Sequence, residues 1–68
     1  MLIKIGGIES QIPDTSSIQE MLKLNNISGN SLMGLIVVVN GNVIRKEQWD
    51  MPLNLNDNIE IIRMVSGG

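Results

Sequence analysis

The decapeptide LIVVVNGNVI, residues 35–44, carries the clearest turn signal in this chain. Aliphatic residues fill positions 35–39, the dipeptide Asn40-Gly41 follows, and a second short apolar stretch returns over 42–44. Asn-Gly is favoured in two-residue hairpin loops because both turn positions need a positive φ. Residues 35–44 are therefore predicted to form a β-hairpin.

The stretch IEIIRMV, residues 59–65, is the other strongly apolar segment of this half. It follows a polar turn predicted at Asn56–Asn58, and few polar residues interrupt it. A strand with so few polar breaks is typical of the middle of a sheet, where both faces are covered or partnered. We therefore expect residues 59–65 to form a central strand.

The N-terminal half predicts a hairpin followed by a helix. Residues 2–5 and 8–12 are predicted to form two short strands, and Gly6-Gly7 between them suits a turn with positive φ. The helix should begin near Ser16 or Ser17, because each has Gln or Glu three residues later, the spacing of a capping box. Its predicted apolar stripe consists of Ile18, Met21 and Leu22. The segment 24–31, LNNISGNS, should end the helix, and one helical turn is expected within 45–55, before Pro52.

This order of elements predicts an α+β domain. One main helix between two hairpins should cover one face of a mixed sheet of four to five strands. Placing the last strand beside the first, and parallel to it, gives the β-grasp (ubiquitin-like) topology. We expect residues 1–65 to form this domain and residues 66–68 to form a flexible Gly-Gly tail.

The composition excludes most kinds of catalytic site. The 68 residues include no Cys and no His, which removes thiolate and imidazole metal ligands and the usual nucleophile pairs. The carboxylates lack the spacing of an EF-hand or of a catalytic pair, and no Gly-rich phosphate loop is present. We therefore expect no catalytic residue, no metal and no bound cofactor, and a role as substrate or carrier in chemistry done elsewhere.

The composition also narrows the partners and the compartment. The net charge of −2 and the single aromatic residue argue against nucleic-acid binding. The longest apolar run, 35–39, is too short to span a membrane, and the first residues, MLIKIGG, lack the long apolar segment and the cleavage site of a signal peptide. The absence of Cys fits the cytoplasm, where we expect the protein to reside as a monomer when free.

The segment 37–68, VVVNGNVIRKEQWDMPLNLNDNIEIIRMVSGG, resembles the C-terminal half of the ThiS family, the sulfur carriers of the thiamine pathway. The likeness rests on the VNG hairpin, the R-x-E-x-W segment from Arg45 to Trp49, the polar turn, the apolar last strand and the Gly-Gly end. The N-terminal half matches in pattern. Departures are the Asn56–Asn58 turn, where relatives often have an Asp-Gly-Asp-like turn, and Ser66, where a small residue is common.

The resemblance implies that Gly68 is the reacting residue. In that family a ubiquitin-activating-like enzyme of the ThiF type uses ATP to adenylate the terminal glycine carboxylate. Sulfur from a donor protein then replaces the adenylate to give a thiocarboxylate, which a thiazole synthase of the ThiG type consumes. A free carboxylate is a poor electrophile, so the adenylate supplies the leaving group. Gly67 and Ser66 would form a thin thread, about 10 Å long with Gly68, that enters an active-site channel.

Three other functions fit the same sequence. The small subunit of molybdopterin synthase and a tRNA-thiolation carrier share the fold and the tail chemistry. A plain β-grasp interaction module would have the fold without that chemistry, and removing Gly67 and Gly68 separates it from a carrier. A β-grasp iron–sulfur protein is excluded because the chain has no Cys.

Strand alternation predicts a docking surface on the face of the sheet opposite the helix. If Ile59 and Ile61 point to the helix, the uncovered face carries an apolar set, with Lys4 at its rim. This predicted set is Leu2, Ile36, Val38, Ile62 and Met64. A loop or a second copy of the chain covering this face remains the alternative. Trp49 has two interpretations, a residue that closes the end of the core and an anchor for a partner.

Overall fold

The computed structural model describes residues 1–27 and 34–63 of the chain. Five strands, one α-helix and one 3₁₀ turn follow each other along these residues. Their bounds are β1 Leu2–Ile5, β2 Ile8–Gln11, α1 Ile18–Leu24, β3 Leu35–Val39, β4 Asn42–Ile44, η2 Lys46–Gln48 and β5 Asn58–Arg63.

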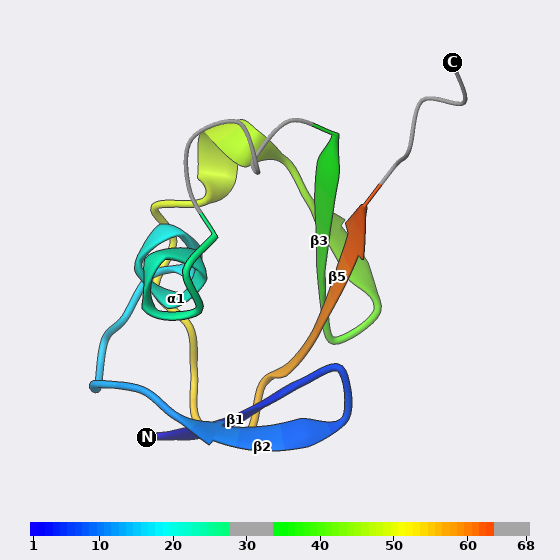
Figure 1. Cartoon of the computed structure of the whole chain (residues 1–68). Coiled ribbons are helices and arrows are strands. Elements are labelled where there is room, and N and C mark those ends of the chain that lie inside the picture. Colours follow the sequence, from blue (N-terminus) through cyan, green and yellow to red (C-terminus); the bar gives the residue numbers. More distant parts are fainter. Residues whose placement is uncertain (28–33, 64–68) are drawn as a thin grey trace.

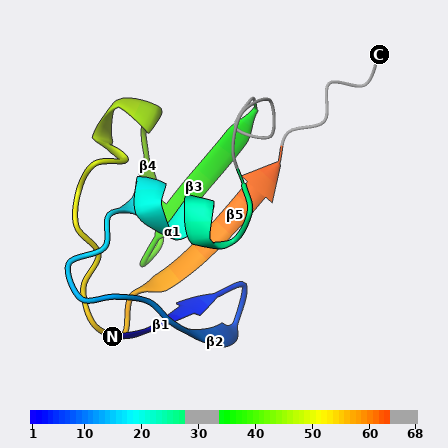
Figure 2. The ribbon, with the colours of Figure 1, turned by 60° about the vertical axis from the view of Figure 1, so that its left-hand side comes forward.

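The strands form one mixed sheet in the order β2-β1-β5-β3-β4, so that β5 is central as predicted. β5 runs parallel to β1, with Ile5 opposite Ile59, and antiparallel to β3, with Val37 opposite Ile61. α1 lies against one face of this sheet in both ribbon views (Figures 1 and 2). The predicted β-grasp arrangement of an α+β domain is confirmed.

Both predicted hairpin turns are present, with the predicted backbone geometry. Gly6 and Gly7 have φ values of 58° and 82°, and Asn40 and Gly41 have values of 52° and 84°. Positive φ at both central positions is the geometry of a type I′ turn, whose twist matches that of the flanking strands. The β3–β4 turn therefore fixes the register that places Val38 opposite Val43.

Of the two predicted caps, Ser17 is the one that begins α1. Its hydroxyl accepts a hydrogen bond from the Glu20 backbone N–H at 3.1 Å, and the Glu20 carboxylate accepts one from the Ser17 N–H at 3.2 Å. Ser16 is buried, and its hydroxyl donates to the Pro13 carbonyl at 2.6 Å. The helix ends at Leu24, and Asn26 follows with a φ of 61°, as the Asn-rich sequence predicts.

Two boundaries differ from the prediction. β2 ends at Gln11, one residue early, because Gln11 pairs with Leu2, the first residue of β1. Ile12 follows with a buried side chain just before Pro13, and its N–H donates to the Met1 carbonyl at 2.9 Å. The polar turn predicted at 56–58 is centred on Leu55 and Asn56 instead. Asn56 adopts a φ of 67°, and Asn58 already belongs to β5. Residues 64–65 of the predicted last strand lie outside the described residues.

The core is aliphatic and lies between α1 and the inner face of the sheet. It consists of Ile3, Ile12, Ile18, Met21, Leu22, Leu35, Val37, Trp49, Leu53 and Ile59. The irregular segment after β4 closes this side of the molecule, since the backbone N–H groups of Ile18 and Gln19 donate to the carbonyls of Met51 and Trp49. Within residues 1–27 and 34–63, no helix has both the length and the apolar character needed to cross a membrane.

Candidate functional site

The face of the sheet that points away from α1 carries a patch of aliphatic side chains. We call it the outer-face patch and define it as Ile36, Val38, Val43 and Ile62. Ile36 lies opposite Ile62 in the β3–β5 ladder, and Val38 lies opposite Val43 in the β3–β4 ladder. Side chains of directly opposed residues project from the same face, so the four form one cluster.

Burial confirms which residues point to each face. Ile59 and Val37 are fully buried, and Ile61 and Val39 pack against the core as partly buried residues. The alternating residues of the same strands are not among those packed against the core: Ile36 and Val38 are half-buried, and Ile62 has 45% of its surface exposed. The structure thus brings together three of the five predicted docking residues, Ile36, Val38 and Ile62.

Val43 was not among the predicted docking residues, and it is the most exposed member of the patch at 66%. The signal for it was present in the sequence. With a two-residue loop at Asn40-Gly41, Val39 pairs with Asn42 and the next pair is Val38 with Val43. Val43 therefore lies opposite Val38 and on the same face of the sheet.

Leu2 lies on the predicted outer face of the sheet but outside the patch, and its predicted part in docking stays a prediction. The Asn56 backbone N–H donates to the Leu2 carbonyl at 2.8 Å, so Leu2 lies beside the chain just before β5 begins. Ile62 comes six residues after Asn56, so it lies about 20 Å from Asn56 along the strand at the usual rise of an extended chain. Leu2 and Ile62 share a face of the sheet but lie near opposite ends of it. Met64 lies outside the described residues.

Trp49 lies in the core with 4% of its surface exposed. Its indole N–H points to the Ile44 carbonyl at 3.4 Å, at the end of β4. These contacts support the interpretation of Trp49 as a packing residue that closes the core. So little exposed surface leaves little of the ring for a partner to contact.

The patch lies at the end of β5 from which the chain leaves toward its C-terminus. Arg63 is the last residue of β5, opposite Leu35, and the pair Ile62 and Ile36 is the next one inward. The predicted tail residues Ser66, Gly67 and Gly68 lie outside the described residues. They follow Arg63 by three to five positions in the sequence.

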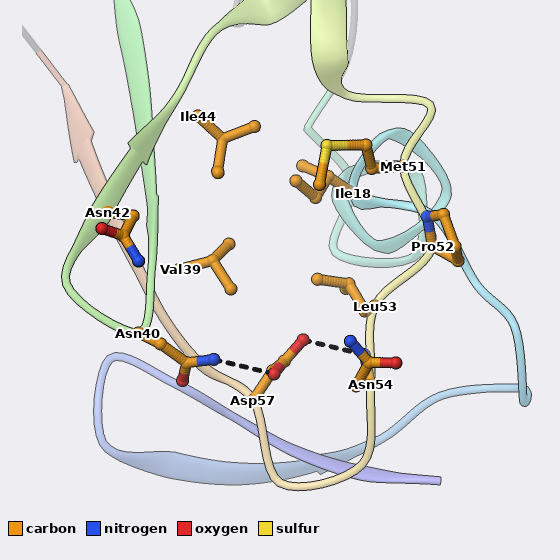
Figure 3. Close-up of a pocket in the computed structure, with 10 residues that line it drawn as sticks. All are labelled: Ile18, Val39, Asn40, Asn42, Ile44, Met51, Pro52, Leu53, Asn54 and Asp57. Atoms are coloured by element: carbon orange, nitrogen blue, oxygen red, sulfur yellow. Dashed lines mark hydrogen bonds between the residues drawn. The ribbon is translucent and has the colours of Figure 1, made fainter.

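A hollow of about 200 Å³ opens on the other side of the sheet, between the β3–β4 hairpin and residues 51–54 (Figure 3). Ile18, Val39 and Leu53 form part of its apolar wall. Its one carboxylate, Asp57, accepts hydrogen bonds from the Asn40 side chain at 2.9 Å and from the Asn54 backbone N–H at 2.8 Å. This hollow lies at the start of β5, about 17 Å along the strand from Arg63, so it is distant from the point where the tail begins.

The part of the chain that the structure describes contains no group of side chains suited to hold a metal ion. The described carboxylates are dispersed, and Asp57 is the one that is buried among residues 1–27 and 34–63.

The sequence matches the model of the ThiS family over residues 3–68. The chain belongs to the ThiS family. The match extends through the Gly-Gly end and includes the outer-face patch. No curated protein matched the sequence significantly.

Two solved structures share the fold of this ThiS-family chain. A crystal structure of the thiamine biosynthesis protein ThiS from Geobacter metallireducens superposes with a TM-score of 0.82 at 21% identity, covering 100% of both chains. An NMR structure of a thiamine biosynthesis protein from the same organism gives a TM-score of 0.73 at 21% identity, covering 100% of this chain and 88% of the other. At this identity the likeness confirms the β-grasp fold.

Proposed function

We propose that this chain is a sulfur carrier of thiamine biosynthesis, and that the C-terminal carboxylate of Gly68 is its reacting group. The observation that carries the proposal is the ThiS-family match over residues 3–68, which includes the Gly-Gly end. The chain has no Cys and no His, which supports a role as a carrier that other enzymes act on.

The proposed chemistry has two steps at the Gly68 carboxylate. First, a carboxylate oxygen attacks the α-phosphorus of ATP in an adenylating enzyme of the ThiF type, and pyrophosphate leaves. Second, the outer sulfur of a persulfide on a donor protein attacks the acyl carbon of the adenylate, and AMP leaves. A thiol then attacks the donor's sulfur in the resulting acyl disulfide, which breaks the S–S bond, leaves a disulfide between the thiol and the donor, and releases the thiocarboxylate. The product is a thiocarboxylate, from which a thiazole synthase of the ThiG type takes the sulfur. ATP is used by the partner and no cofactor is held by this chain.

The outer-face patch is the proposed docking surface for these partners. Contiguous exposed aliphatic side chains on a small domain usually mark an interaction site. The patch is also next to the end of β5, and the five residues that follow Arg63, positions 64–68, span at most about 18 Å when fully extended. An enzyme bound on the patch would therefore need its catalytic site within that distance of Arg63.

The thiazole pathway is favoured over two other carriers by the family match. The small subunit of molybdopterin synthase and a tRNA-thiolation carrier would use the same tail chemistry with a different acceptor. A β-grasp interaction module would use the patch alone. The pathway reactions take place in the cytoplasm in this proposal.

Deletion of Gly67 and Gly68 tests the proposal. The unmodified gene should restore growth without thiamine to a cell that lacks its own sulfur carrier, and the deletion should abolish that growth. A thermal melt of the truncated protein serves as the control, because the described core should keep its stability. Growth restored equally by the truncated chain would contradict the carrier function and would favour the interaction module.

A further inference from the structure

A carboxylate borders the outer-face patch directly. Glu60 projects from β5 on the outer face, opposite Val38, and Val43 follows in the same row on β4. Ile62 is the next outward residue of the same strand. Glu60 is therefore an acidic group that shares a continuous surface with the four aliphatic side chains.

The other neighbour of Glu60 in its row has no side chain. β1 lies parallel to β5 with Ile5 opposite Ile59, so the next position along, Gly6, comes beside Glu60. The hydrogen bond of 2.9 Å from the Gly6 N–H to the Ile59 carbonyl confirms this register. Because Gly6 has no side chain, no side chain covers Glu60 from the β1 side. The Glu60 carboxylate is therefore accessible to a partner on the outer face of the sheet.

Glu60 also lacks a cation within the described chain. Over residues 1–27 and 34–63 the one ion pair joins the Met1 ammonium to Asp14 at 3.0 Å. Lys4 also projects from the outer face. It pairs with Asn58, two residues before Glu60 on β5, and lies directly opposite Glu9 on β2. Among residues 1–27 and 34–63, no cationic nitrogen lies within 4.0 Å of the Glu60 carboxylate.

These features constrain the partner that can cover the patch. Covering the aliphatic residues removes water from the adjoining carboxylate, and a carboxylate that loses water without gaining a cation weakens the complex. A partner with a purely apolar surface would carry that cost. A guanidinium or ammonium group opposite Glu60 would remove it, and a guanidinium matches a carboxylate with two parallel hydrogen bonds.

We propose that Glu60 is a specificity-determining residue of the docking surface, and that the adenylating enzyme presents an arginine or lysine to it beside an apolar surface. The identity of this partner rests on the proposed function. A second copy of the chain fits less well, because a two-fold contact centred on the patch brings two Glu60 carboxylates together. The net charge of −2 on each copy adds to that repulsion.

Titration calorimetry with the cognate adenylating enzyme tests this inference through Glu60→Gln and Glu60→Lys. We expect about tenfold weaker binding for Glu60→Gln and about a hundredfold for Glu60→Lys, since the second places like charges opposite each other. The control pair, Glu9→Gln and Glu9→Lys, makes the same charge changes at an exposed outer-face position of β2 beyond the patch. Both control variants should bind within about twofold of the unmodified chain. Unchanged circular dichroism shows that each variant is folded.

Each alternative has its own outcome in this experiment. If Glu60→Gln binds the enzyme as tightly as the unmodified chain, the inference is overturned and the proposed function is not. If Glu9→Gln loses as much affinity as Glu60→Gln, the loss is an effect of net charge and the inference is overturned in the same way. A dimer of the chain that dissociates when the enzyme binds, seen by sedimentation velocity, would assign the patch to a second copy and also overturn it. Failure of the unmodified chain to bind the enzyme would overturn the proposed function and this inference with it.

Discussion

At the scale of single residues, the contacts of Asp57 hold the β3–β4 turn against the beginning of β5. One carboxylate oxygen accepts a hydrogen bond from the Asn40 side chain, and the other accepts one from the Asn54 backbone N–H. The side-chain oxygen Oδ1 of Asn40 in turn accepts a hydrogen bond from the Asn58 backbone N–H at 2.9 Å. Asp57 has only 7% of its surface exposed, so these contacts are largely shielded from water.

We expect Asp57→Ala to lower the free energy of unfolding by about 2 kcal/mol, because it leaves two donors without their acceptor in a shielded site. Urea denaturation measures the change, and Asp50→Ala is the matched control since Asp50 is exposed. A loss no larger than that of the control would show that the Asp57 contacts contribute nothing to stability.

The role of Asp57 was not predictable from the sequence, although its surroundings were. Residues 56–58 read as a polar turn, and Asn40 reads as a hairpin residue, and both interpretations are correct in outline. Their contact depends on β3 and β5 being neighbours, which brings together residues 17 positions apart in the chain. Local sequence patterns predict where turns form, but they do not predict which side chain from a distant part of the chain will form a hydrogen bond with a carboxylate.

At the scale of elements, the alternation along β5 separates the residues that stabilise the fold from those available to a partner. Ile59 and Ile61 face α1, and Glu60 and Ile62 face outward. Alternation with period two predicted these faces correctly for β3 and β5. It also put Leu2 on the outer face, but it could not give the position of Leu2 along the sheet relative to Ile62. The offset between the parallel strands β1 and β5 is set by their pairing, which no local pattern encodes.

A pair of substitutions, Ile61→Glu and Ile62→Glu, tests the two faces of β5. Ile61→Glu places a carboxylate against the aliphatic core, so it should unfold the domain or lower its melting temperature strongly. Ile62→Glu should keep the domain folded and weaken its binding to the adenylating enzyme, because Ile62 belongs to the outer-face patch. Thermal melts and calorimetry measure the two effects.

Two results would contradict this assignment. If Ile62→Glu unfolds the protein while Ile61→Glu does not, the faces are reversed. If Ile62→Glu is folded and binds normally, the docking surface lies elsewhere on the molecule.

At the scale of the whole molecule, the β-grasp topology sets the patch and the exit of the chain at the same end of the central strand. The sequence supports this topology through two hairpin turns, one capped helix and an apolar last strand, and each of these local signals agrees with the observed fold. The hollow between the β3–β4 hairpin and residues 51–54 was not predicted, because it arises where three separate segments meet.

Substitution of Gly67 by valine tests whether a narrow channel receives the end of the chain. The melting temperature should stay nearly unchanged, since the buried residues of the described sheet and helix are untouched. Adenylation should be suppressed, because a branched side chain widens a segment that glycine keeps thin. Normal adenylation kinetics for Gly67→Val would exclude a channel that grips this residue.

The most direct test of the proposed carrier function is intact-protein mass spectrometry after incubation with the adenylating enzyme, ATP and a sulfur source. The account predicts an adenylate, or the exchange of one oxygen for sulfur, and fragmentation should locate the change at Gly68. Omission of ATP is the control and should leave the mass unchanged. A modification located on any side chain, or no modification with an adenylating enzyme shown to be active, would contradict the assignment of the Gly68 carboxylate as the reacting group.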